Sequence, residues 1–81
     1  MENNTLRLKT IVSELLKIDI KDINDDLEAK STETWDSFNT LNIIMEIENE
    51  FNIEVDLEEL INLSTFKHLK DLLEKNNIKC S

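Results

Sequence analysis

Apolar residues in the first part of the chain recur at the spacing of one helical face, which predicts an amphipathic helix. They are Leu8, Ile11, Val12, Leu15 and Leu16. We expect this helix to run from about Thr5 to about Lys17, with Asn4 or Thr5 capping its start. Residues 18 to 36 lack this period, so they predict a long first loop. Four scattered apolar residues can pin the loop across the fold: Ile18, Ile20, Ile23 and Leu27.

The second helix is expected from about Ser37 to about Phe51, and it carries two apolar stripes. The stripe that we assign to the core consists of Ile43, Ile44, Ile47 and Phe51. A neighbouring stripe consists of Phe38, Leu41 and Met45. Together the stripes are wider than a bundle helix needs, so the second one either completes the core or stays partly exposed for partner proteins.

Two further helices complete the expected fold. Asp56 and Glu59 resemble a capping pair for a short third helix, which covers Leu57, Leu60 and Ile61. Ser64 or Thr65 can cap a fourth helix, whose apolar face is Phe66, Leu69, Leu72 and Leu73. We therefore predict an all-α fold, a small antiparallel four-helix bundle with three longer helices and one short one, in a single domain over residues 1–81.

Composition favours a carrier or binding module over an enzyme. A chain of 81 residues cannot easily enclose a water-excluding active site in addition to its core. The absence of glycine excludes Gly-rich phosphate loops. His68 is the only histidine and is expected at the surface or edge of the last helix, where it supports neither a catalytic triad nor a zinc site. We predict no catalytic residue and no metal site.

The start and end of the chain suggest where the protein works. Its polar first residues resemble no signal peptide, and no apolar run has the length of a membrane span. The one cysteine, Cys80, cannot form an internal disulfide, and we interpret it as an incidental thiol in a reducing compartment. We expect a monomer in the cytoplasm with no membrane span.

The net charge of -9 is concentrated in the middle of the chain. Residues 31–66 contain no Lys or Arg and nine acidic residues, including Glu46 and Glu48, whereas the other acids and the bases cancel. This segment is either a solvated surface that aids solubility or a docking surface for basic partners. Both interpretations disfavour nucleic acid, because its phosphates would be repelled.

The most informative motif is Trp35-Asp36-Ser37-Phe38. A serine at a helix start, after an acidic residue, can be an ordinary N-cap. Here the serine follows a long loop and opens an acidic amphipathic helix, and Asp36-Ser37-Phe38 resembles the Asp-Ser-Leu attachment motif of acyl carrier proteins. The following stretch, residues 39–55, resembles the second helix of that family. The similarity covers nearly the whole chain in length, helix order and loop placement.

This resemblance implies that Ser37 carries a 4'-phosphopantetheine arm, which a phosphopantetheinyl transferase adds from coenzyme A. It implies that Asp36 helps to hold the transferase's metal ion and that the arm's thiol carries the acyl group. Phe38, Leu41 and Met45 would then face partners, namely the transferase and acyl-transferring or acyl-activating enzymes. Glu46 and Glu48 are assigned to the same docking surface, which would attract basic patches on these enzymes.

Several residues depart from the family's pattern. Trp35 stands where carriers of general fatty acid synthesis usually have Gly, Phe38 replaces the usual Leu, and Asn39 and Asn42 occupy positions that are often acidic. Trp before Asp-Ser resembles specialised stand-alone carriers, so the pathway stays open between fatty acid and specialised metabolite biosynthesis. The alternative hypothesis is an acidic helical interaction domain that binds a basic protein and is never modified.

Overall fold

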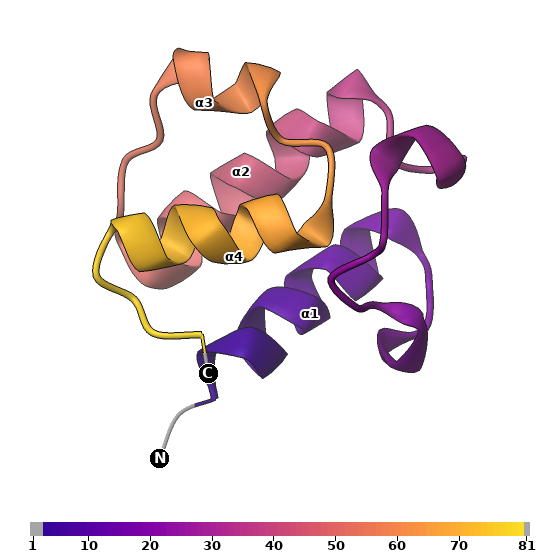
Figure 1. Cartoon of the computed structure of the whole chain (residues 1–81), viewed down its shortest axis with the longest axis horizontal. Coiled ribbons are helices and arrows are strands. Elements are labelled where there is room, and N and C mark those ends of the chain that lie inside the picture. The colour runs from indigo at the N-terminus through magenta and orange to yellow at the C-terminus, as the bar shows by residue number, and fades with distance from the viewer. Residues whose placement is uncertain (1–2, 81) are drawn as a thin grey trace.

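The computed structural model describes residues 3–80, which form four α-helices, with two short 3₁₀ helices in the long first loop (Figure 1). The elements are α1 (Asn4–Leu16), η1 (Ile20–Asp22), η2 (Ala29–Ser31), α2 (Ser37–Phe51), α3 (Leu57–Ile61) and α4 (Phe66–Lys75). The all-α fold with three longer helices and one short one is therefore confirmed. The expectation of one domain over residues 1–81 extends to residues 1–2 and 81, which lie outside the described part.

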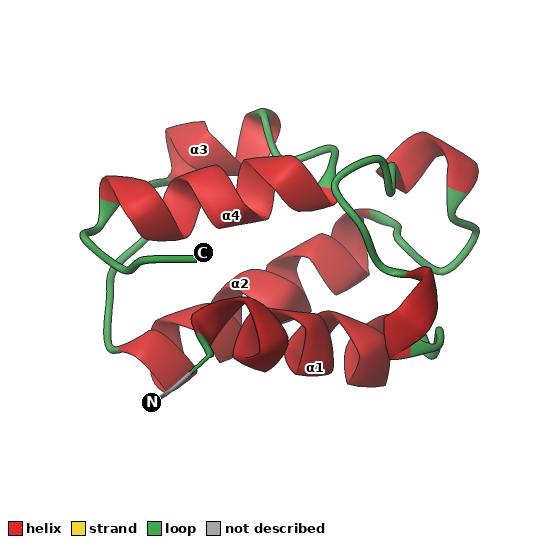
Figure 2. Ribbon diagram, turned by 60° about the horizontal axis from the view of Figure 1, so that its bottom comes forward, coloured by secondary structure: helices red, strands yellow, loops and turns green. Residues whose placement is uncertain are grey.

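The helices form two layers, with α1 and α2 in one and α3 and α4 in the other (Figure 2). α1 runs antiparallel to α2 and α4 (Figure 1). α2 and α4 run in roughly the same direction, because α3 and its flanking loops lead the chain back before α4 begins (Figure 1). No helix within residues 3–80 has the length and apolar character needed to cross a membrane.

The core lies between the layers and contains one face of each longer helix. Its buried helical residues are Leu8, Val12, Leu16, Ile43, Ile44, Ile47, Phe66, Leu69, Leu72 and Leu73. Phe51 was expected among them, but it is only partly buried and packs against the edge of the core. It is the last residue of α2, and the Arg7 guanidinium covers its ring at 4.5 Å from the centroid. Its position at the helix end explains why the full burial expected for Phe51 is wrong.

Polar side chains fix the helix ends. Asn3 caps α1, since its side chain accepts a hydrogen bond from the backbone N–H of Leu6 at 3.0 Å, so the expected cap at Asn4 or Thr5 is wrong. Thr65 caps α4 as expected, by accepting from the His68 N–H at 3.1 Å. Asn52 ends α2 with a φ of 56°, a left-handed conformation that Asn tolerates better than most residues.

Glu59 and Leu60 attach the short helix α3 to the rest of the fold. Asp56 precedes it but makes no side-chain capping bond, so the expected Asp56–Glu59 capping pair is wrong. Glu59 instead pairs with Lys75 of α4 at 2.6 Å, and this hydrogen bond raises the pKa of Lys75. Leu60 packs against the core, whereas Leu57 and Ile61 are exposed. One side of α3 therefore presents apolar groups to solvent.

The long first loop is held against the bundle by apolar packing and by backbone hydrogen bonds. Three of its four expected pins pack into or against the core: Ile18, Ile23 and Leu27. Ile20 is exposed. The loop also pairs with the segment before α4, because the Ala29 N–H donates to the Ser64 carbonyl at 2.8 Å and the Phe66 N–H donates to the Leu27 carbonyl at 3.0 Å. The chain is thus fixed shortly before α2 begins.

The C-terminal segment returns to α1. The Thr5 hydroxyl donates to the Cys80 carbonyl, and the Asn4 side-chain amide donates to the Lys79 carbonyl at 2.9 Å. Cys80, interpreted from sequence as incidental, is buried in the core, and this burial raises the pKa of its thiol. The cysteine therefore has a packing role that its place near the chain end did not suggest.

Candidate functional site

Ser37 is the first residue of α2, and its side chain is exposed. Asp36 is the N-cap: its Oδ1 accepts from the Asn39 N–H at 2.8 Å, and its backbone carbonyl accepts from the Thr40 N–H at 2.9 Å. The capping role that a serine could have at this position is thus performed by Asp36. The Ser37 hydroxyl stays outside the cap, at the positive end of a long helix.

The turn before Ser37 is held by a backbone hydrogen bond of its own and by one side chain from the first turn of α2. The backbone N–H of Trp35 donates to the Thr32 carbonyl at 2.9 Å, and the Asn39 side-chain amide donates to the Thr34 carbonyl at 2.7 Å. A carboxylate could not donate this second bond. The structure therefore gives a physical reason for Asn39 at a position that the sequence comparison with the family's pattern gave as often acidic.

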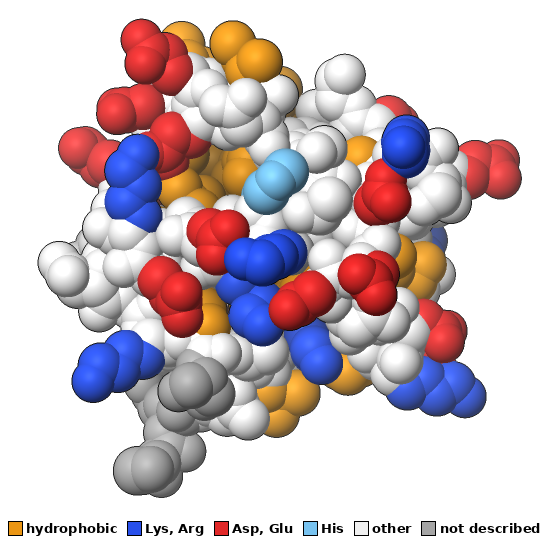
Figure 3. Space-filling model, in the orientation of Figure 1, with side chains coloured by type: hydrophobic (Ala, Val, Ile, Leu, Met, Phe, Trp, Pro, Cys, Tyr) orange, Lys and Arg blue, Asp and Glu red, His pale blue; other side chains and the backbone are white. Residues whose placement is uncertain are grey.

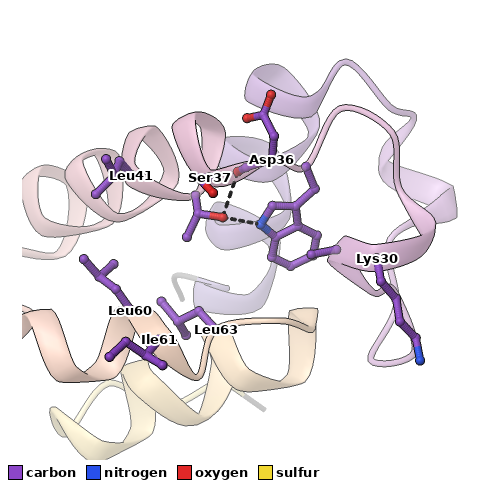
Figure 4. A pocket seen from close by; sticks show the side chains of 10 residues that line it. Lys30, Asp36, Ser37, Leu41, Leu60, Ile61 and Leu63 are labelled. Atoms are coloured by element: carbon purple, nitrogen blue, oxygen red, sulfur yellow. Dashed lines mark hydrogen bonds between the residues drawn. The ribbon is translucent and has the colours of Figure 1, made fainter.

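Trp35 anchors the start of α2 to the core. Its side chain is buried, and its indole N–H donates to the Thr40 hydroxyl at 3.0 Å. That hydroxyl in turn donates to the Asp36 carbonyl at 3.0 Å, and dashed lines in Figure 4 mark both bonds. The sequence indicated Trp35 only as a departure from a familiar pattern. Its burial and its polar partner become visible in the structure.

An open cleft of about 570 Å³ lies beside Ser37. Ser37 and Leu41 of α2 stand on one side, and Leu60 and Ile61 of α3 face them across it (Figure 4). Lys30 lies at its edge and extends away from it (Figure 4). The cleft residues of α3 were not predicted, because only the fold brings this helix against the start of α2.

The second apolar stripe of α2 lies outside the core. Phe38, Leu41 and Met45 are 71%, 49% and 63% exposed, so this stripe does not complete the core. Leu57 and Ile61 of α3 add to the exposed apolar residues. Acidic side chains lie beside the apolar ones at α3 (Figure 3). This surface combines apolar contact area with negative charge, as a docking surface for a basic partner requires.

The two acidic residues assigned to docking differ in their surroundings. Glu46 is exposed. Glu48 is half-buried, and its Oε2 accepts from the backbone N–H of Val55 at 2.9 Å. Glu48 therefore holds the loop that follows α2, a role that the sequence did not indicate. Among residues 3–80, no three His, Cys, Asp or Glu side chains form a group that could bind a metal ion.

The remaining described serines use their hydroxyl groups within the fold. Ser13 donates to the Ile18 carbonyl at 2.6 Å, and Ser31 donates to the Glu28 carbonyl at 3.2 Å. The Ser64 hydroxyl lies 3.3 Å from Nδ1 of His68, a half-buried residue at the edge of α4. Ser81 lies outside the described residues.

Comparison with known proteins agrees with this arrangement. Residues 6–73 match a family model described as "Phosphopantetheine attachment site". The acyl carrier protein of Buchnera aphidicola subsp. Acyrthosiphon pisum is 34% identical over 79 residues, which cover 98% of this chain and 99% of the relative. The acyl carrier protein of Thermotoga maritima is 28% identical over 69 residues, 85% of each chain.

Acyl carrier proteins are non-catalytic carriers that receive a covalent 4'-phosphopantetheine group from a phosphopantetheinyl transferase and then serve partner enzymes. The family match covers well over half of the chain, and the relative from Buchnera aphidicola aligns over nearly all of it. The chain therefore belongs to the acyl carrier protein family.

Proposed function

We propose that Ser37 is the residue that carries the 4'-phosphopantetheine group. The observation that supports this assignment is its exposed hydroxyl at the start of α2, which forms no hydrogen bond within residues 3–80. A phosphodiester there would lie at the positive end of the helix dipole, close to backbone N–H groups that have no intrahelical partner. The site thus fits a negatively charged attachment.

Asp36 supports the same assignment. Its carboxylate is exposed, and its Oδ1 is used by the capping bond to Asn39. A carboxylate has a second oxygen that can also accept or bind a cation. We therefore assign Asp36 a double role, as the cap that orients Ser37 and as an aid to the transferase's divalent metal ion during attachment.

When bound, the group supplies a terminal thiol that carries an acyl group as a thioester. Leu41, Leu60 and Ile61 offer apolar contacts to that acyl group in the cleft beside Ser37. Cys80 does not compete as an acyl carrier, because it is buried and burial raises the pKa of its thiol. The chain's own contribution is to place the arm, shelter the acyl end and present both to other enzymes.

The docking surface of this carrier consists of four residues on α2: Phe38, Leu41, Met45 and Glu46. Its basic partners are the transferase and the acyl-transferring or acyl-activating enzymes. Charge complementarity with these enzymes accelerates encounter. Glu48 adds negative potential to this surface from its half-buried position. We place the protein in the cytoplasm as a monomer that serves fatty acid or specialised metabolite biosynthesis.

Intact mass spectrometry tests the proposal. The protein is incubated with a phosphopantetheinyl transferase, coenzyme A and Mg²⁺, and we expect the wild type and Ser31→Ala to gain the mass of one arm. Ser31→Ala is the matched control, because Ser31 is also an exposed serine and directly follows Lys30, which lines the cleft. Ser37→Ala should gain nothing. A wild type that stays unmodified would support the alternative, an acidic interaction domain that binds a basic partner without modification.

A further inference from the structure

Two residues separate the cleft beside Ser37 from the interior of the bundle. Of the residues that line the cleft, Trp35 and Leu63 are buried, at 4% and 8% exposure, and the others are exposed or half-buried. Both also belong to the core cluster, which includes the fully buried Ile43 and Ile47. They therefore form the floor of the cleft, and the indole of Trp35 is the larger of the two side chains.

The indole is held in place by the helix that carries Ser37. Its N–H donates to the Thr40 hydroxyl, which donates to the Asp36 carbonyl. Turning the ring away would break this hydrogen bond and remove the indole from its buried position in the core. The floor is therefore coupled to the first turn of α2, where the attachment site lies.

We propose that Trp35 is a specificity-determining residue, which limits how deeply a carried acyl group enters the bundle and so favours short acyl groups over long chains. This inference rests on the proposed function, because it requires an acyl group tethered at Ser37. Such a group contacts Leu41, Leu60 and Ile61 in the open cleft. Further methylene groups meet the indole rather than the core, stay in water and gain no hydrophobic stabilisation.

The test loads the protein with butanoyl, octanoyl or dodecanoyl groups from the corresponding acyl-coenzyme A, using a transferase. Intact mass confirms loading, and the melting temperature is compared with that of protein carrying the arm alone. In the wild type we expect the gain in melting temperature to level off after butanoyl. In Trp35→Leu it should continue to rise, by at least about 4 °C from butanoyl to dodecanoyl, as added methylenes become buried.

Two control variants isolate the role of the ring. Trp35→Phe keeps an aromatic floor and should level off as the wild type does. Leu41→Ala changes an exposed wall of the cleft, so it should lower the gain from butanoyl without moving the point at which the gain levels off. Trp35 is the only tryptophan of the chain, so its fluorescence gives a readout that needs no variant. We expect its emission to change with butanoyl and to stay constant for longer groups.

The outcomes separate this inference from the function on which it rests. Absence of any mass increase overturns both. Normal loading with the same length dependence in the wild type and Trp35→Leu overturns the role of Trp35 alone. If Trp35→Leu does not fold, wild-type emission that keeps shifting from octanoyl to dodecanoyl overturns it as well.

Discussion

Charge reversal at Glu46 and at Glu48 should affect two different properties of the protein. Glu46 is exposed, so Glu46→Lys should change the free energy of unfolding by no more than about 0.5 kcal/mol, the usual range for such surface changes. Its effect should be slower modification by the transferase. Glu48→Lys should instead destabilise the fold, because it removes the acceptor for the Val55 N–H.

The magnitude for Glu48 follows from this one hydrogen bond. Glu48 and Val55 are both half-buried, so water replaces the lost acceptor only in part. Leaving a buried donor unsatisfied costs about 1–3 kcal/mol. In a domain of this size each kcal/mol lowers the melting temperature by roughly 4–8 °C. Glu48→Gln is the matched control, since the amide oxygen can still accept from Val55 and most of the stability should return.

Two measurements on each variant check this prediction: a thermal melt followed by circular dichroism, and the rate of arm transfer at low and high salt. The rate defect of Glu46→Lys should shrink with salt, because the screening length falls from about 10 Å at 0.1 M to about 3 Å at 1 M. Equal melting temperatures for Glu46→Lys and Glu48→Lys would refute the structural role of Glu48. A wild-type rate for Glu46→Lys at low salt would refute the docking role of Glu46.

Three further predictions concern the core, the cysteine and a helix end. In a urea melt, Ile47→Ala should lower the free energy of unfolding by about 2–5 kcal/mol, and Phe51→Ala should lower it by less than the roughly 3–5 kcal/mol typical of a buried ring. Met45→Ala should lower it by under about 1 kcal/mol and should instead slow arm transfer. A Met45→Ala variant as unstable as Ile47→Ala would place both stripes in the core. Burial raises the pKa of the Cys80 thiol, so its contribution to stability is complete below the unfolded pKa of about 8.5 and is lost as pH rises through the folded pKa. Between neutral and alkaline pH, the melting temperature should therefore fall further for the wild type than for Cys80→Ala. An equal fall in the two proteins would contradict this. Lys17 ends α1 with a φ of 58°, so Lys17→Gly should raise the free energy of unfolding by about 1 kcal/mol, and a destabilised variant would show that the left-handed end carries no strain.

Features set by local pattern could be predicted from sequence. The bounds of α2 agree with the expected Ser37 and Phe51, because a strong apolar period follows a good capping residue. The start of α1 was misplaced, because Asn3 and Asn4 are both competent caps and only the fold chooses between them. The Asp56 cap failed for a related reason, since its partner Glu59 pairs with a lysine on another helix.

Features that depend on segments distant in sequence could not be predicted. The cleft beside Ser37 combines residues 35–41 with residues 60–63, and no local pattern relates the two. Glu46 and Glu48 both fall on the polar side of α2, so only the course of the following loop distinguishes them. Trp35 was identified as unusual, but its place in the cleft floor depends on where α3 and its following loop lie.

Peptide mapping of the modified wild-type protein identifies the residue that carries the arm. After incubation with transferase and coenzyme A, the chain is digested and the arm is located by fragment masses. We expect a single arm on the peptide that contains Trp35-Asp36-Ser37-Phe38, with Ser37 as the modified residue. An arm on Ser13, Ser31, Ser64 or Ser81, or no arm on any peptide, would contradict it.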